Sequence, residues 1–262
     1  MSYHDVEGLR YFTFDGLDDL NVDHAIITRR GGVSRAPYES LNLGGTVGDD
    51  PSRVRQNQRL VMSALELPDE SIYDVWQVHG DVVVSTDGPR PNDQPHQQAD
   101  ATLTDRPGVT LLMRFADCVP ILLYDPIKSV VGIAHAGWKG TVLRTAAQAV
   151  VAMQEKYESH PADLWAGIGP SIGPHHYEVG AQVESEVLGA FGQDASELLN
   201  SPNGKGQGVQ FDLWTANQIV LSQAGVRNIE ISGVCTACDL DNWYSHRDEG
   251  GTTGRFGALI TL

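Results

Sequence analysis

Short apolar or β-branched runs alternate along the chain with longer amphipathic stretches. The short runs end at Gly, Pro or Asp, which is typical of strands that stop at turns. They predict strands at 81–85, 108–113, 119–124, 129–134, 164–168, 228–232 and 256–262. Strands and helices follow one another without the regular alternation of a doubly wound parallel sheet. The pattern therefore predicts an α+β fold with mixed β-sheets flanked by helices.

Four longer stretches have the composition of helices. Residues 51–65 follow the pair Asp50-Pro51, which supplies an N-cap and a first-turn proline. Residues 212–223 begin in a similar way at the capping residue Asp212. The remaining helices are predicted at 141–157 and 179–191.

No internal repeat, long charge block or Ser/Pro linker marks a domain boundary in the 262 residues. We therefore expect one domain over 1–262 with long loops. The polar stretch 86–99 contains three prolines and predicts a loop that could close over a site. The first residues do not resemble a signal peptide, and no apolar run approaches the roughly 20 residues that cross a bilayer. A cytoplasmic location is therefore expected.

The net charge narrows the choice of partners. With 34 acidic and 18 basic residues, the formal charge is −16 at pH 7. Such a surface repels phosphate backbones and anionic lipids, so neither a nucleic acid nor a membrane is expected as a partner. A local basic pocket for a small anion remains compatible with this charge. Only three cysteines are present, which argues against a disulfide-stapled secreted fold.

The strongest candidates for chemistry are His79, Cys118 and His135, which stand in the stretches WQVHG, ADCVP and HAGWKGT. Each lies at a predicted strand end or strand-to-turn junction, so the three can converge in space. Two imidazoles and a thiolate form a three-ligand set that leaves the fourth position of zinc open. The spacing alone also permits ordinary core residues, or Cys118 as a nucleophile with a histidine as its base.

Other motifs allow more than one interpretation. Lys139 precedes a predicted helix start and could bind phosphate, although a plain turn explains the segment equally well. Arg247 lies in a Gly-rich loop, where it could recognise a polar ligand or pair with a surface carboxylate. The C-x-x-C pair Cys235 and Cys238 could be redox-active or half of a zinc site, but a second pair is missing, which favours small buried thiols near a turn. The adjacent residues His175 and His176 could ligate a metal, but adjacent side chains diverge in an extended chain, which argues against such a site.

Taken together, these stretches resemble the YfiH family, also called the multicopper polyphenol oxidoreductase (laccase) family. That group includes bacterial purine nucleoside phosphorylases, peptidoglycan editing factors and laccase domain-containing proteins. The resemblance runs from about Thr28 to the C-terminus. It rests on the ordered motifs TRRGGVS, PYESLNLG, VGDDPSRVRQN, WQVHG, ADATLT, ADCVPILLYD, HAGWKGT, GIGPSIGPHHYEVG, FDLWTANQIVLSQAGV, SGVCTAC and GGTTGR.

The resemblance implies a single α+β domain and a zinc centre in which His79, Cys118 and His135 are both metal ligands and catalytic residues. It also implies phosphorolysis of adenosine, inosine and methylthioadenosine, and deamination of adenosine. The implied partners are a purine nucleoside and phosphate. The substrate-binding residues expected on these grounds and from the motifs above are Arg29, Asn42, Gln77, Lys139 and Arg247.

Several alternatives stay open at this point. Deamination needs an acid beside the metal, and Asp100 and Asp117 are both candidates. Peptidoglycan editing would use Cys118 or a metal-activated water to attack an amide carbonyl. A non-catalytic metal-binding module is less compatible with an open three-ligand set. Copper is disfavoured against zinc because the nine histidines include no His-x-His pair for a multinuclear cluster.

Overall fold

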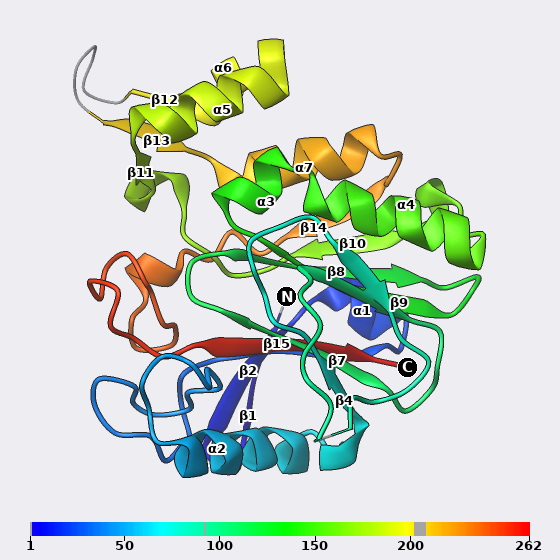
Figure 1. Cartoon of the computed structure of the whole chain (residues 1–262), viewed down its shortest axis with the longest axis vertical. Coiled ribbons are helices and arrows are strands. Elements are labelled where there is room, and N and C mark those ends of the chain that lie inside the picture. The colour runs from blue at the N-terminus through cyan, green and yellow to red at the C-terminus, as the bar shows by residue number, and fades with distance from the viewer. Residues whose placement is uncertain (1, 92, 202–207) are drawn as a thin grey trace.

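Two six-stranded mixed sheets form the centre of the molecule. The computed structural model describes residues 2–91, 93–201 and 208–262 (Figure 1). The first sheet has the order β1 (Ser2–Val6), β2 (Leu9–Thr13), β3 (Asp23–Ile27), β15 (Phe256–Thr261), β7 (Thr110–Phe115) and β4 (Ile72–Asp74). The second has the order β14 (Asn228–Ile231), β10 (Trp165–Ile168), β8 (Val119–Asp125), β9 (Val130–Ala136), β6 (Ala101–Thr104) and β5 (Val83–Ser85).

The pairing within both sheets is mostly antiparallel. The parallel pairs are β4 with β7, β10 with β14, and β5 with β6. A smaller third sheet has the order β11 (Glu178–Val179), β13 (Val209–Phe211) and β12 (Leu199–Asn200). These mixed sheets confirm the predicted α+β class.

One of the apolar cores lies between the two large sheets. Phe115 and Phe256 from the first sheet pack in one buried cluster with Leu122 and Ile133 from the second. The strands β8 and β9 are buried along their whole length, since helices cover their other face. Burial of these apolar side chains fixes the sheets relative to each other, so residues at neighbouring strand ends hold fixed positions.

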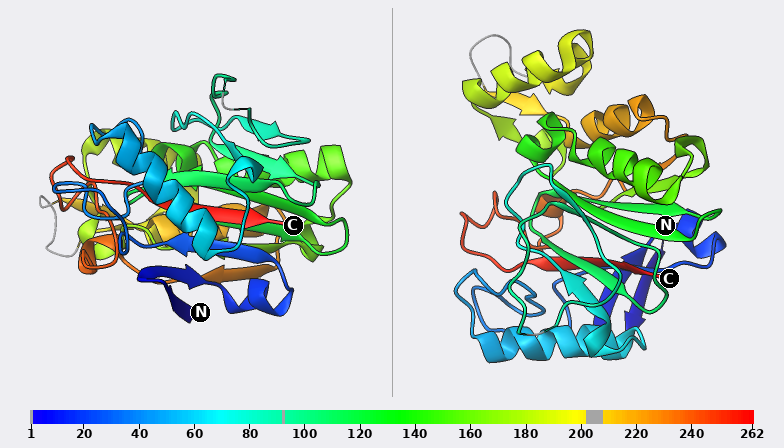
Figure 2. Two further views of the ribbon diagram at one scale, coloured as in Figure 1. Left: turned by 90° about the horizontal axis from the view of Figure 1, so that it is seen from below. Right: turned by 45° about the vertical axis from the view of Figure 1, so that its right-hand side comes forward.

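Helices cover the outer faces of both sheets. The helices α4 (Thr145–Tyr157) and α7 (Leu213–Gln223) contribute to the cluster behind the second sheet. The helices α3 (Trp138–Val142), α5 (Ala181–Phe191) and α6 (Ala195–Leu198) lie on the same side (Figure 1). The helix α2 (Pro51–Ala64) crosses the outer face of the first sheet, and α1 (Asp15–Asp19) connects β2 to β3 (Figure 2). Among the described residues, no helix combines the length and apolar character needed to span a membrane.

Most predicted elements are confirmed within a few residues. The side chain of Asp50 accepts a hydrogen bond from the Ser52 amide at the start of α2. Asp212 caps α7 through the amides of Trp214 and Thr215. The predicted strands correspond to β5, β7, β8, β9, β10, β14 and β15.

Two predicted helices needed correction. The stretch 141–157 is not one helix, because Arg144 has a left-handed backbone (φ 61°) that separates α3 from α4. The stretch 179–191 becomes helical only at Ala181, because residues 178–179 pair with β13 instead. The strands β1 to β4, β6 and β11 to β13 were not predicted. Most are short or follow no clear apolar alternation, and cross-strand pairing stabilises them.

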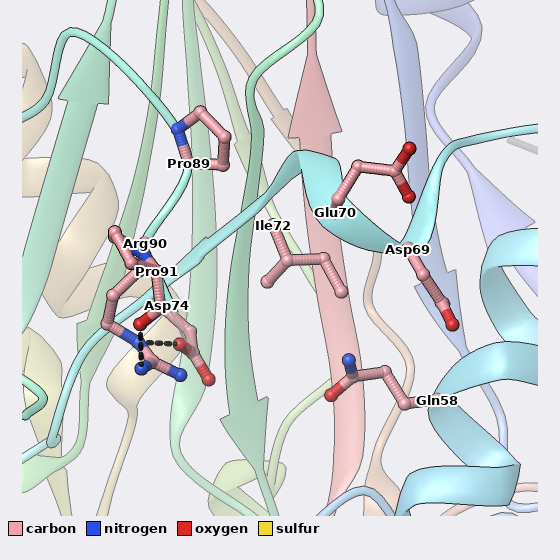
Figure 3. A pocket seen from close by; sticks show the side chains of 8 residues that line it. All are labelled: Gln58, Asp69, Glu70, Ile72, Asp74, Pro89, Arg90 and Pro91. Atoms are coloured by element: carbon pink, nitrogen blue, oxygen red, sulfur yellow. Dashed lines mark hydrogen bonds and ion pairs between the residues drawn. The ribbon is translucent and has the colours of Figure 1, made fainter. Parts of the chain in front are cut away.

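A buried ion cluster joins β4 to its neighbours. The Asp74 carboxylate contacts Arg90 Nε at 2.7 Å, Arg114 Nη1 at 2.9 Å and His96 Nε2 at 3.2 Å. Figure 3 shows Asp74 and Arg90 in contact at one end of a small pocket, with Asp69 at the other. Burial raises the pKa of Asp74, but the charge of Arg114 and the hydrogen bond from Arg90 lower it more, so the net shift is downward.

We expect Asp74→Asn to lower the free energy of unfolding by about 3 kcal/mol, because it leaves two half-buried guanidinium groups without their counter-charge. Asp69→Asn is the matched control: its contact with Arg59 is 3.4 Å long and exposed, so it should change stability by less than about 1 kcal/mol. Chemical denaturation measures both. Equal effects of the two substitutions would contradict the role given to Asp74.

The lowered pKa of Asp74 also sets the sign of a pH effect. Its stabilising contribution is fully present above the ordinary carboxyl pKa of about 4 and is lost as the pH falls through the lower folded-state value. The wild-type protein should therefore lose more stability on acidification than Asp74→Asn does.

Candidate metal centre and cavity

His79, Cys118 and His135 meet although 39 and 17 residues separate them in the sequence. His135 lies in β9, and Cys118 directly precedes β8, whose first residues pair with the end of β9. His79 follows β4 in a loop, where its φ of 58° turns the chain sharply. One ligand atom from each residue lies within 4.8 Å of the others. The three side chains form a group that can hold a metal ion.

The buried carboxylate of Asp100 holds this group in place. It accepts hydrogen bonds from the backbone amides of Val78, His79 and Gly80 at 3.1, 3.0 and 2.7 Å. Its Oδ1 also lies 2.8 Å from Nδ1 of His135. With Nδ1–H donated to Asp100, Nε2 of His135 is the nitrogen that remains for a metal, as in carboxylate–histidine–metal arrangements.

Cys118 and His135 shift each other's pKa values in opposite directions. Burial raises the pKa of Cys118, but the charge of His135 and hydrogen bonds to both histidines have a larger, opposite effect. The net result is a pKa of about 6. Burial lowers the pKa of His135, whereas the Cys118 charge and the Asp100 hydrogen bond raise it to about 9. The thiolate is the form of cysteine that ligates metals and attacks electrophiles.

Gly137 allows the thiol to lie close to the start of α3. A Cβ atom at this position would lie 2.8 Å from Cys118 Sγ and 3.6 Å from His79 Cδ2. Any larger residue would therefore displace a member of the group. This explains the small residue in the HAGW motif.

The group opens onto a cavity of about 460 Å³, which is within the range of small-ligand sites. Besides the three residues of the group, two arginines line it: Arg114 from β7 and Arg255 just before β15. The other lining residues are Leu43, Gly44, Gly45, Thr46, Val54, Val75, Trp76, Gln77, His96, Ala116 and His246. The cavity thus combines a soft ligand group with fixed positive charge in an acidic protein.

Two of the expected binding residues belong to this cavity or its wall. Gln77 lines the cavity, and its amide side chain bonds both the N–H and the carbonyl of Arg114. Asn42 is fully buried, and its Oδ1 accepts hydrogen bonds from the amides of Gly44 and Arg255, each at 2.8 Å. Asn42 therefore positions two lining segments without lining the cavity itself.

Three other expected binding residues lie elsewhere in the described part of the chain. Arg29 stacks 4.3 Å above the Tyr244 ring and pairs with Glu249 at 3.0 Å. Arg247 lies over Tyr177 and donates to a backbone carbonyl. Lys139 is exposed on α3, and none of the three is among the residues that line the cavity. Their proposed binding roles stay predictions.

Sequence reasoning did not select Trp76, His96, Arg114, His246 or Arg255. The sequence does contain features that could have pointed to some of these residues. Arg114 is the one charged residue within the apolar strand TLLMRF. Arg255 ends the GGTTGR motif, and Trp76 begins WQVHG. The loop 86–99, expected to close over a site, does contribute His96 to the cavity.

A second group contains His175, His176, Cys235 and Cys238, and its ligand atoms also lie within 4.8 Å of one another. The expectation that the two adjacent histidines diverge was wrong, because residues 174–176 form a 3₁₀ turn and not an extended chain. The expectation of two buried thiols was half right, since Cys235 is buried and Cys238 is exposed.

Comparisons with known proteins find relatives that cover most of the chain. Residues 23–262 match the family described as multi-copper polyphenol oxidoreductase laccase. A protein of Deinococcus radiodurans named purine nucleoside phosphorylase is 38% identical, covering 93% of this chain and 90% of that protein. The purine nucleoside phosphorylase YlmD of Geobacillus stearothermophilus is 39% identical, with coverages of 90% and 88%.

Solved structures show the same fold. The crystal structure of the Bacillus licheniformis hypothetical protein YfiH superimposes with a TM-score of 0.91 at 34% identity, covering 99% of this chain and 98% of that one. The structure of YlmD from Geobacillus stearothermophilus also gives a TM-score of 0.91, at 32% identity and coverages of 98% and 97%.

We expect Asp100→Asn to weaken the binding of added Zn²⁺ by about 10- to 100-fold, as changes in groups that orient metal ligands commonly do. The uncharged side-chain amide of asparagine cannot accept all four hydrogen bonds with the strength of the Asp100 carboxylate. Asp81→Asn, in the exposed stretch just after Gly80, is the matched control and should leave the affinity unchanged. Competition with a chromophoric chelator measures the affinities, and equal affinities for the two variants would contradict the role of Asp100.

Proposed function

This chain belongs to the multi-copper polyphenol oxidoreductase laccase family, and we propose that it is a zinc-dependent purine nucleoside phosphorylase. The substrates we propose are adenosine, inosine and methylthioadenosine, together with phosphate. Relatives that carry the name purine nucleoside phosphorylase support the general activity. The observation that carries the proposal is a His₂Cys group opening onto a cavity that two arginines line.

The side chains of the group fit zinc. His79 and His135 supply imidazole nitrogens and Cys118 a thiolate, a ligand set in which one coordination position stays open. A zinc ion bound there would supply a Lewis acid beside the cavity. The family name refers to copper, but a multinuclear copper cluster needs many more imidazoles than these two.

The arginines supply the site for phosphate. Within the guanidinium of Arg255, only Nη1 has hydrogen-bond partners in the described part of the chain, namely the carbonyls of Thr253 and Gly254. Arg114 is held by the Leu43 carbonyl and by Asp74, which fixes its direction. Guanidinium groups bind phosphate oxygens in a bidentate manner, so Arg255 can position the attacking anion.

The reaction needs a place for the base as well. Phosphate oxygen forms a bond to C1′ of the ribose, while the bond from C1′ to the purine nitrogen breaks and its electron pair leaves with the base. The indole of Trp76, which is 51% exposed and lines the cavity, offers a surface on which a purine can stack. The imidazoles of His96 and His246 line the same cavity and can exchange the proton that the leaving base takes up.

Deamination of adenosine has less support from the geometry. It needs a free acid near the metal, and both candidate carboxylates are already engaged. Asp100 accepts four hydrogen bonds. Asp117 accepts from the Thr236 hydroxyl and from the Arg247 amide, each at 2.7 Å. We therefore propose phosphorolysis as the main activity.

Product analysis from adenosine, with and without phosphate, tests this proposal. We expect adenine and ribose 1-phosphate, formed only when phosphate is present. Inosine formed without phosphate would replace phosphorolysis by deamination. Turnover of a UDP-muramyl-serine compound without turnover of nucleosides would point to peptidoglycan editing. His79→Ala should abolish the phosphorolysis, and retained activity in that variant without metal would overturn the zinc requirement.

Two variants test which basic residue binds the phosphate. We expect Arg255→Lys to raise the KM for phosphate about tenfold or more, because lysine keeps the charge but loses the planar pair of donors. The KM for adenosine should change much less. Lys139→Ala separates this position from the one suggested by the HAGWKGT motif. A rise in the phosphate KM in Lys139→Ala, with none in Arg255→Lys, would move the phosphate to the start of α3.

A further inference from the structure

We propose that His175, His176, Cys235 and Cys238 form a second, closed zinc site with a structural role. These four residues are called the His₂Cys₂ cluster below. None of them lines the cavity of the candidate centre. The proposal is independent of the phosphorylase activity, since it concerns a different set of ligands.

Three distances within the cluster are close to those between the ligands of a tetrahedral zinc. His175 Nε2 lies 3.1 Å from Cys238 Sγ, and His176 Nδ1 lies 3.5 Å from both sulfurs. Ligands bound to one tetrahedral zinc with ordinary bond lengths lie about 3.3–3.8 Å apart. All four donor atoms lie within 4.8 Å of one another, so small shifts of the side chains would let them bind one zinc ion.

The backbone brings these ligands together from two distant segments. Residues 174–176 and 236–238 each form a 3₁₀ turn. Ser171 and Cys235 pair as a parallel bridge, which places the two turns side by side. The first turn orients both histidines towards the sulfurs, with ring centroids 4.8 Å apart and planes at 57°.

Gly173 shows that the close approach is built into the fold. Its amide donates a hydrogen bond to Cys235 Sγ at 3.1 Å. A Cβ atom at this position would lie 2.7 Å from His175 Cε1 and 3.1 Å from Cys235 Cβ. An amide aimed at a sulfur is a common outer contact of a metal-bound thiolate, since it offsets the negative charge.

The donor set indicates which metal binds and what role it has. Two thiolates with two imidazoles in tetrahedral arrangement are typical of structural zinc, in which all four positions belong to the protein. The candidate centre differs, because it has three ligands and an adjoining cavity. The fold thus separates an open site from a closed one.

The closed site would support the open one through a short chain of contacts. Cys235 precedes Thr236, whose hydroxyl donates to Asp117 Oδ1 at 2.7 Å. Asp117 has a left-handed backbone (φ 79°) and directly precedes Cys118. The Asp117 carbonyl also accepts from the amide of Ile172, in the segment before the histidines. Zinc in the cluster would therefore fix the turn that carries Cys118.

Metal content of the full-length protein tests the proposal in a background without the first centre. After incubation with ZnSO₄ and removal of free metal, Cys118→Ser should retain one zinc per chain by elemental analysis. Cys118→Ser/Cys238→Ser and Cys118→Ser/His175→Ala should retain none. Cys118→Ser/His160→Ala is the matched control, since His160 is an exposed histidine outside both groups, and it should retain one. Loss of zinc in folded Cys118→Ser alone would overturn the proposal.

Cobalt substitution identifies the ligands directly. In Cys118→Ser only Cys235 and Cys238 remain as thiols, so a thiolate-to-cobalt charge-transfer band must arise from the cluster. We expect this band, with the visible absorption of tetrahedral cobalt, and expect both to vanish in Cys118→Ser/Cys238→Ser. A Cys235–Cys238 disulfide that persists after treatment with reductant and then with metal, detected by thiol counting, would exclude the site.

Thermal unfolding measures the structural role. The melting temperature of Cys118→Ser should fall on treatment with a strong chelator and recover with zinc. The same treatment should leave Cys118→Ser/His175→Ala unchanged. An equal response of the two proteins to the chelator would contradict a stabilising metal in the cluster.

Discussion

The candidate centre depends on the hydrogen bonds that the buried Asp100 carboxylate accepts. A buried carboxylate is costly unless hydrogen bonds replace its water, and here three backbone amides and one imidazole do so. The amides belong to the loop that carries His79, and the imidazole is that of His135. One group therefore sets the left-handed turn at His79 and the ring orientation of His135 together. The geometry of the group follows from satisfying this single charge.

Both large sheets contribute residues to the cavity lining. The second sheet supplies His135 and the start of β8 that follows Cys118, while the first supplies Arg114 and the residue before β15, Arg255. The apolar core between the sheets keeps these two sides at a fixed separation. The His₂Cys group and two arginines thus line the same cavity, although the whole chain carries a charge of −16. Local placement of charge matters more for anion binding than the total.

The sequence allowed the fold class and most long elements to be predicted, because α2, α7 and the strands β7 to β10 have clear apolar patterns and caps. It also selected His79, Cys118 and His135 as a possible group. It could not select Trp76 or His246, which contact the cavity only through the packing of separate loops. Arg29 was expected from a family motif and Arg247 from its Gly-rich loop. Both contact aromatic rings and carbonyl groups away from the cavity lining, and their binding roles stay predictions. Contacts between distant segments leave no periodic signal in the chain.

By itself the sequence determined the alternation of strands and helices, because burial of apolar faces leaves a regular pattern, and the ordered motifs that indicate the family. Tertiary structure alone decided which polar residues meet. The adjacent residues His175 and His176 illustrate the difference. An extended chain would separate their side chains, whereas the 3₁₀ turn and the bridge to Cys235 direct both towards two sulfurs about 60 residues away. Backbone conformation and long-range pairing, not spacing, set that convergence.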